Sequence, residues 1–194
     1  MISTGSVIAT LFTDAREFLH REYERNQFTL DVGRYVGWWA HPLYYLIWTL
    51  ILPQPYESAW LRFASSISFI PIFFYKDYPV RFWPWLMLYM YLWLTFALPV
   101  IFTFLMLMND LSGMWLVCET MMFLAFALAI PNFFLMMSFL VVGIAIGYLG
   151  FVWTTGSHLV LTTDLIEYML PIPMAILLVV LFHCFNNFSA RSAS

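Results

Sequence analysis

Long apolar stretches separated by short polar breaks run along most of the chain. A membrane-spanning helix needs about 20 mostly apolar residues, within a range of roughly 17 to 25. Six such stretches cover residues 36–52, 59–75, 83–108, 111–130, 132–153 and 168–186. The breaks between them carry prolines, glycines or charges, as in PQPYES, KDYPVR and NDLSG. The pattern predicts an all-α, polytopic membrane protein with six transmembrane helices.

The positions of the cations indicate how these helices are oriented. Lysine and arginine residues in short loops are retained on the cytoplasmic side of a membrane. With six spans, the cations outside the spans all fall on one side: Arg16, Arg21, Arg25, Arg34, Lys76, Arg81 and Arg191. We therefore predict that both ends of the chain lie in the cytoplasm.

The residues before the first span form a different pattern. Ile8, Leu11, Phe12, Leu19 and Tyr23 recur at helical spacing, while charged residues lie on the other faces. This pattern is typical of a helix that lies along a membrane surface. We expect residues 1–34 to form a cytoplasmic amphipathic segment, residues 35–187 the transmembrane domain and residues 188–194 a cytoplasmic tail. The first apolar stretch is followed by charges rather than a cleavage site, so no signal peptide is predicted.

Composition narrows the range of functions. The chain is 63% hydrophobic and 10% charged, against roughly 45–50% and about 25% in an average soluble domain. Its net charge of −3 provides no positive surface for binding nucleic acid. The expected partner is therefore the lipid bilayer and not nucleic acid. Two cysteines without metal-site spacing and the absence of nucleotide-binding motifs predict no metal, no cofactor and no catalytic residues.

Four ionisable residues fall within the predicted spans, where charge is costly and each one is a functional candidate. Arg62 lies near the outer end of the second span and is expected to snorkel to the interface or to pair with Asp110. His41 precedes Pro42 in the first span, and we interpret it as structural because kinks recruit polar side chains. His183 lies near a helix C-terminus, where the helix dipole favours a cation. The fourth residue, Glu119, lies deepest.

The deep carboxyl of Glu119 must be either protonated or paired. Trp115 precedes it by one helical turn on the same face, and Cys118 flanks the pair. Two interpretations stay open. This face is either one wall of a pocket for a mostly apolar ligand with a small polar head, or a helix-packing seam with one satisfied carboxyl.

Several strings in the chain are similar to a known family. VGWWAHPLYYLIW, PQPYESAWLR, FLMLMNDLSGMW and TTDLIEY resemble the membrane sensor region of CqsS-type and LqsS-type quorum-sensing histidine kinases. The family consists of receptors in the bacterial inner membrane for α-hydroxyketone autoinducers. The resemblance implies a homodimeric six-helix sensor, followed in the family by a cytoplasmic kinase and phosphatase.

The resemblance also implies a ligand and its contacts. The ligand would be a long-chain α-hydroxyketone or amino-ketone. Trp115 and Cys118 match positions associated with the fit of the ligand chain, and Met174 and Cys184 match positions associated with head-group recognition. The chain ends at Ser194 without a kinase motif, so we expect either the sensor portion of a longer kinase or a stand-alone homologue that signals through a partner.

The leading hypothesis is therefore a transmembrane sensor domain that binds a small apolar autoinducer and signals to a histidine kinase output. The alternative is a small transporter or channel in which Glu119 and Arg62 form part of a polar pathway. A structural subunit that docks a partner is a third possibility. An intramembrane enzyme ranks last, because no nucleophile and base occur at a defensible spacing.

Overall fold

The computed structural model describes residues 4–158, 174, 177–178 and 180–181, and within them it contains helices and no strand. The all-α prediction is confirmed for this part of the chain. The α-helices are α1 (Thr4–Arg25), α2 (Gln27–Leu46), α3 (Ala59–Ser68), α4 (Ile70–Phe73), α5 (Trp83–Thr95), α6 (Ile101–Met108), α7 (Gly113–Ala129) and α8 (Phe133–Thr155). Shorter stretches are the π-helical η1 (Ile47–Ile51) and η4 (Phe96–Val100) and the 3₁₀-helical η2 (Tyr75–Asp77) and η3 (Val80–Phe82).

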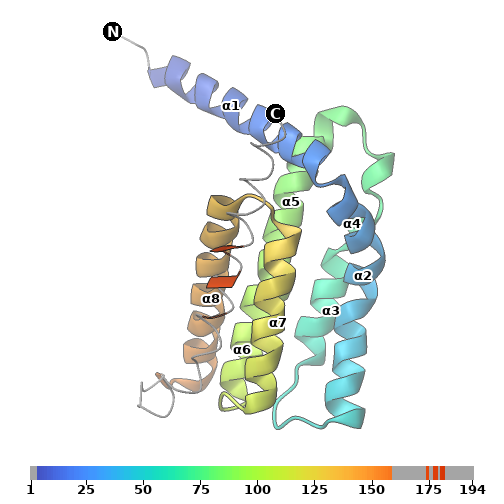
Figure 1. Ribbon diagram of the computed structural model, residues 1–194, viewed down its shortest axis with the longest axis vertical. Coiled ribbons are helices and arrows are strands. Elements are labelled where there is room, and N and C mark those ends of the chain that lie inside the picture. Colours follow the sequence, from blue (N-terminus) through green and yellow to red (C-terminus); the bar gives the residue numbers. More distant parts are fainter. Residues whose placement is uncertain (1–3, 159–173, 175–176, 179, 182–194) are drawn as a thin grey trace.

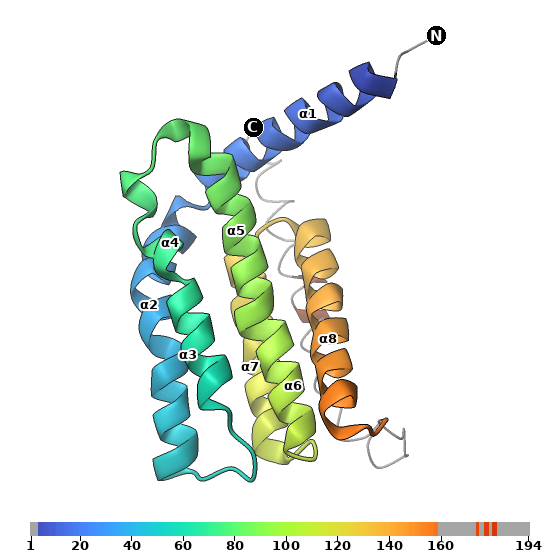
Figure 2. The same ribbon diagram turned by 180° about the vertical axis from the view of Figure 1, so that it is seen from behind.

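The helices run up and down beside one another in a bundle, and α1 leaves one end of it obliquely (Figures 1 and 2). The connection between α4 and α5 lies at the same end as α1, whereas the α2–α3 and α6–α7 connections lie at the opposite end. We call these the α1 end and the far end. Helices α5, η4 and α6 form one continuous rod, which α8 contacts along its length and α7 contacts at η4 and α6.

Several helix boundaries have a local cause. Ser58 and Asn132 cap α3 and α8, because their side-chain oxygens accept hydrogen bonds from backbone N–H groups in the first turn. Pro71 separates α3 from α4, since a proline has no N–H to donate to the preceding turn. Pro99 lies inside the π-helical turn η4 of the central rod for the same reason.

The predicted spans agree with the helices in type and differ at some ends. The N-terminal helix is present, but it ends at Arg25, and α2 begins at Gln27 rather than at residue 36. Two described helices, Val80–Met108 and Phe133–Thr155, are long and apolar enough to cross a membrane. The shorter apolar helix Gly113–Ala129 occupies most of the fourth predicted span. Most of the sixth predicted span, 168–186, lies outside the described residues.

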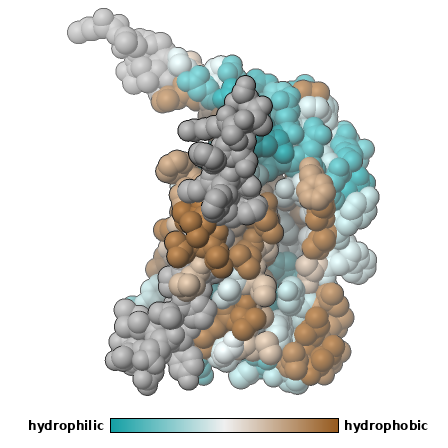
Figure 3. Space-filling model, in the orientation of Figure 1, coloured by the Kyte–Doolittle hydropathy of each residue, from teal (hydrophilic) through white to brown (hydrophobic). Residues whose placement is uncertain are grey.

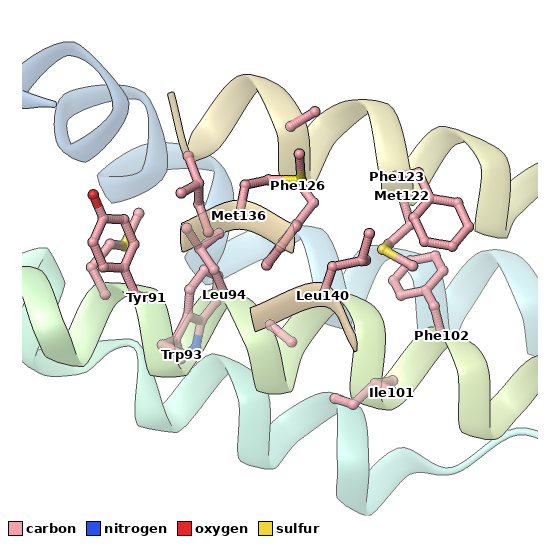
Figure 4. Packing of buried hydrophobic residues seen from close by; sticks show 14 of the residues in the cluster. Tyr91, Trp93, Leu94, Ile101, Phe102, Met122, Phe123, Phe126, Met136 and Leu140 are labelled. Atoms are coloured by element: carbon pink, nitrogen blue, oxygen red, sulfur yellow. The ribbon is translucent and has the colours of Figure 1, made fainter. Parts of the chain in front are cut away.

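The rod and α8 are both apolar but differ in how much of their surface is buried. In the most apolar part of Val80–Met108 78% of residues are buried, against 22% in Phe133–Thr155. Figure 4 shows the core in which Tyr91, Leu94 and Phe102 of the rod meet residues of α7 and α8. The outer face of α8 carries exposed apolar side chains that include Val141, Leu149 and Trp153. Figure 3 shows such hydrophobic surface along this flank, with hydrophilic residues gathered near the α1–α2 junction.

Two glycines bring α8 against the rod. A Cβ atom at Gly143 would lie 2.5 Å from Pro99 Cγ, and one at Gly147 would lie 2.7 Å from the Val100 carbonyl oxygen. Small residues four apart allow two helix backbones to approach this closely. The seam therefore fixes α8 at the level of η4.

The amphipathic face of α1 is used partly for packing. Tyr23 is buried and stacks on Trp83 with ring centroids 4.5 Å apart. Leu11 and Phe12, nearer the start of the helix, are 62% and 56% exposed. Only the first half of the helix therefore presents apolar side chains that a membrane surface could cover.

Candidate functional site

A buried arginine forms the centre of the polar cluster in the far half of the bundle. Arg62 Nε and Nη2 donate to the two carboxylate oxygens of Glu57, both at 3.0 Å. The Arg62 side chain is 0% exposed and that of Glu57 is 3% exposed. Such two-point pairs are the strong form of the arginine–carboxylate interaction. The predicted alternatives, snorkelling to the interface or pairing with Asp110, are both wrong, because Arg62 is fully buried and Asp110 lies exposed in the α6–α7 turn.

Histidine and aromatic rings enclose the same guanidinium. His41 of α2 is 4% exposed, and its Nδ1 lies 3.4 Å from Arg62 Nη1. Since the guanidinium is always a donor, we assign Nδ1 as the acceptor and place the ring proton on Nε2. The guanidinium carbon also lies 5.7, 5.5 and 5.9 Å from the ring centroids of Tyr44, Phe102 and Trp115. Residues of α2, α3, α6 and α7 thus converge on one charge, which the ring faces help to stabilise.

The predicted Trp115–Glu119 wall lies beside this charge. Trp115 is 0% exposed and its ring centroid lies 5.6 Å from that of Trp48 in η1. Glu119 is 1% exposed, and the Thr103 hydroxyl donates to its Oε1 at 2.8 Å. Three buried atoms here have no hydrogen-bond partner among the described residues: Trp48 Nε1, Trp115 Nε1 and Glu119 Oε2. Two donors and one acceptor are therefore open to a further polar group. We call Glu57, Arg62, His41, Trp48, Trp115, Thr103 and Glu119 the Arg62 cluster.

The sequence found part of this cluster. It singled out Arg62, His41, Trp115 and Glu119, which the structure brings together, and Cys118, which is half-buried beside them. It missed Glu57, Thr103 and Trp48. Glu57 could have been found from the sequence, because its carboxyl directly precedes the Ser58 helix cap and lies five residues before Arg62. Trp48 and Thr103 carry no local signal, because only packing brings them to α7.

The two residues that the family resemblance associates with head-group recognition lie in the predicted sixth span. Met174 is described and is 56% exposed, whereas Cys184 lies outside the described residues. Their role stays a prediction.

Two cavities accompany the cluster. The first has a volume of about 500 Å³ and lies between α2, the α5–η4 part of the rod and the end of α7, with His41 in its wall. The second, of about 270 Å³, lies between the far part of the rod, α3 and α8, with Leu61, Phe104 and Gly147 in its wall. Both walls are overwhelmingly apolar. Such cavities fit alkyl chains rather than ions or polar metabolites.

Comparison with curated proteins finds a partial match to a membrane-sensor kinase. Over 99 residues, 51% of this chain, the sequence is 32% identical to the CAI-1 autoinducer sensor kinase/phosphatase CqsS of Vibrio cholerae. The matched region covers 14% of the length of that relative. No protein-family model matches the chain, and no solved structure matches it. The match confirms, over half of the chain, the similarity to a CqsS-type sensor region that the sequence motifs indicated.

Proposed function

We propose that the chain is a six-helix membrane sensor domain that binds an α-hydroxyketone-type autoinducer between its helices and controls a cytoplasmic histidine kinase. The observation that carries this proposal is the Arg62 cluster. A buried charge, two unpartnered indole donors and an unpartnered carboxylate oxygen lie inside an otherwise apolar bundle. Polar groups at this depth are costly, and they are typical of sites that recognise something.

The placement of charge supports a membrane orientation with both ends in the cytoplasm. The segments at the α1 end carry Arg16, Arg21, Arg25, Lys76 and Arg81. The far-end connections carry Glu57 and Asp110 and no lysine or arginine. By the positive-inside rule the α1 end faces the cytoplasm, which in a bacterium makes this an inner-membrane protein.

The open polar atoms complement the proposed head group. A ketone oxygen accepts hydrogen bonds, as the indole N–H groups of Trp48 and Trp115 require. A neighbouring hydroxyl or amino group complements Glu119 Oε2, which belongs to a carboxyl with no cation partner among the described residues. Cys118, half-buried on the same helix, stays a predicted contact of the ligand. A neutral head with one acceptor and one donor therefore suits this site.

The proposed effect of the ligand on a kinase rests on the similarity to CqsS and on the thermodynamics of ligand binding. The Vibrio cholerae relative is a sensor kinase and phosphatase, so a ligand that prefers one helix arrangement shifts the balance between the two activities by its difference in affinity. We propose that the predicted sixth span carries this change to the kinase, and that the sensor works as a homodimer. The transporter alternative has less support, because the walls of both cavities are apolar and offer no polar pathway.

The test is direct binding to the purified chain in lipid nanodiscs. We expect a long-chain α-hydroxyketone to change the tryptophan fluorescence saturably, and the matching ketone without the hydroxyl to bind more weakly. Trp115→Phe keeps the ring and removes the indole donor, so affinity should fall by about tenfold, the value of roughly one hydrogen bond.

Trp39→Phe is the matched control, since Trp39 is 68% exposed and its loss removes one tryptophan without touching the cluster. Absence of any saturable change, with protein shown to be folded, would contradict the proposed function. Proton or solute flux that disappears in Glu119→Gln would favour the transporter instead.

A further inference from the structure

The larger cavity lies between α2, α7 and the rod, and several of its lining residues are small. Gly33 and Ala40 of α2, Ala125 and Ala129 of α7 and Met90 of the rod all line it. A Cβ atom at Gly33 would already come within 3.1 Å of the Met90 methyl group. The cavity therefore exists because small residues of both α2 and α7 line it. Its volume of about 500 Å³ lies within the roughly 300–1,000 Å³ of small-molecule sites.

The cavity opens sideways from the bundle. Val32, Val36 and Leu128 line its rim and are 44%, 55% and 65% exposed. In the orientation proposed above this rim faces the lipid, so a molecule dissolved in the membrane reaches the cavity without crossing water. Apolar rim residues on a monomeric surface are typical of contact with lipid or an apolar ligand.

One end of the cavity is polar. His41 forms part of its wall and at the same time lies 3.4 Å from Arg62. The cavity thus ends against the Arg62 cluster, while Trp115 and Cys118 lie outside its lining. An apolar channel that ends at buried polar groups matches an amphiphile with one long chain and a small hydrogen-bonding head.

We propose that this cavity holds the alkyl chain of the signal, which passes His41 from a head group bound at the open atoms of the Arg62 cluster, and that Ala125 and Ala129 limit the chain length. The inference rests on the proposed function and adds a site for the chain that is separate from Trp115 and Cys118.

The test uses the full chain in nanodiscs and a series of α-hydroxyketones of increasing chain length. Ala125→Phe fills the cavity, so affinity for long-chain ligands should fall by about tenfold or more while short-chain ligands change little, since each excluded methylene contributes about fourfold. Ala145→Phe is the matched control, because Ala145 is exposed on α8 and lines neither cavity.

A second variant distinguishes a specific effect on the cavity from misfolding. Leu128→Ala enlarges the cavity at its rim, so it should shift the preference toward longer chains, a gain that an unfolded protein cannot show. If Ala125→Phe and Ala145→Phe bind every chain length as the unchanged protein does, the chain site is wrong and the proposed function stands. If no ligand binds the folded protein, the proposed function fails and the chain site fails with it. A co-purifying phospholipid that is lost in Ala125→Phe, with ligand affinity unchanged, would assign the cavity to a bilayer lipid and overturn the inference.

Discussion

The two ends of the bundle bury acidic side chains in different ways. At the far end, Glu57 pairs with Arg62, and both side chains are out of water. At the α1 end, the Glu22 side chain is as buried as that of Glu57, but its cation, Arg25, is 63% exposed at 3.3 Å. Neutral groups complete the second site: the Tyr91 hydroxyl donates to Glu22 Oε2 at 2.7 Å and the Asn26 amide donates to it at 3.4 Å.

The difference shows that the same ion-pair chemistry has different consequences in different surroundings. Where both charges are buried, each is the main compensation for the other, and removing one leaves a net charge in a low dielectric. Where the cation is in water, the solvent compensates for its loss and the hydrogen bonds carry the site. The far end should therefore be the more sensitive to single substitutions.

The largest effect is expected at Arg62. Arg62→Leu leaves the Glu57 carboxyl buried without its cation, so the free energy of unfolding should fall by about 3–5 kcal/mol. Arg25→Leu, the same change at the α1 end, should cost less than about 1 kcal/mol because that guanidinium is largely solvated. Reversible unfolding in detergent, followed by circular dichroism, measures both. Equal losses in the two variants would refute the contrast between the ends.

A smaller loss is expected at the α1 end when a neutral partner is removed. Tyr91→Phe takes away the hydroxyl that donates to Glu22, and a hydrogen bond to a charged group contributes roughly 1.5–3 kcal/mol. We expect the unfolding free energy to fall within that range. Tyr35→Phe provides the comparison, since Tyr35 is 69% exposed and should change stability by less than about 0.5 kcal/mol. A Tyr91→Phe variant as stable as Tyr35→Phe would mean that Glu22 does not depend on this bond.

Acid should weaken the α1 end through Asp31. The Lys76 ammonium lies 2.6 Å from its carboxylate and the Tyr75 hydroxyl donates at 2.7 Å, and these hydrogen bonds lower the pKa of Asp31. A carboxyl whose pKa is lower in the folded state contributes stability above its unfolded pKa, about 3.9, and loses it as the pH falls through the folded value. The thermal midpoint should therefore decrease below about pH 4, and Asp31→Asn and Lys76→Gln should each flatten that part of the profile. An unchanged profile in both variants would show that the contact is absent in solution.

The smallest effect is expected on the surface of α1. Glu17 lies 3.9 Å from Arg21, and both side chains are about two-thirds exposed. Glu17→Gln should change the unfolding free energy by less than about 0.5 kcal/mol, and added salt should remove even that. A loss as large as that of Tyr91→Phe would indicate that α1 is held by its surface charges rather than by the packing of Tyr23 on Trp83.

The sequence by itself determined the local features. Helix type and most boundaries follow from apolar runs, caps and prolines, because these act over one or two turns. Trp115 and Glu119 were correctly expected on one face, since residues four apart on a helix always are. The seven non-span cations, and with them the predicted orientation, also come from the sequence alone.

Only the tertiary structure decided which distant groups meet. It paired Arg62 with Glu57 rather than Asp110, because the loop before α3 folds the carboxyl back beneath the guanidinium while Asp110 turns outward. It opened the cavity between α2, α7 and the rod, because small residues far apart in the sequence come together in its lining. Contacts of this kind depend on how whole helices pack, and neither spacing nor hydropathy along the chain encodes that packing.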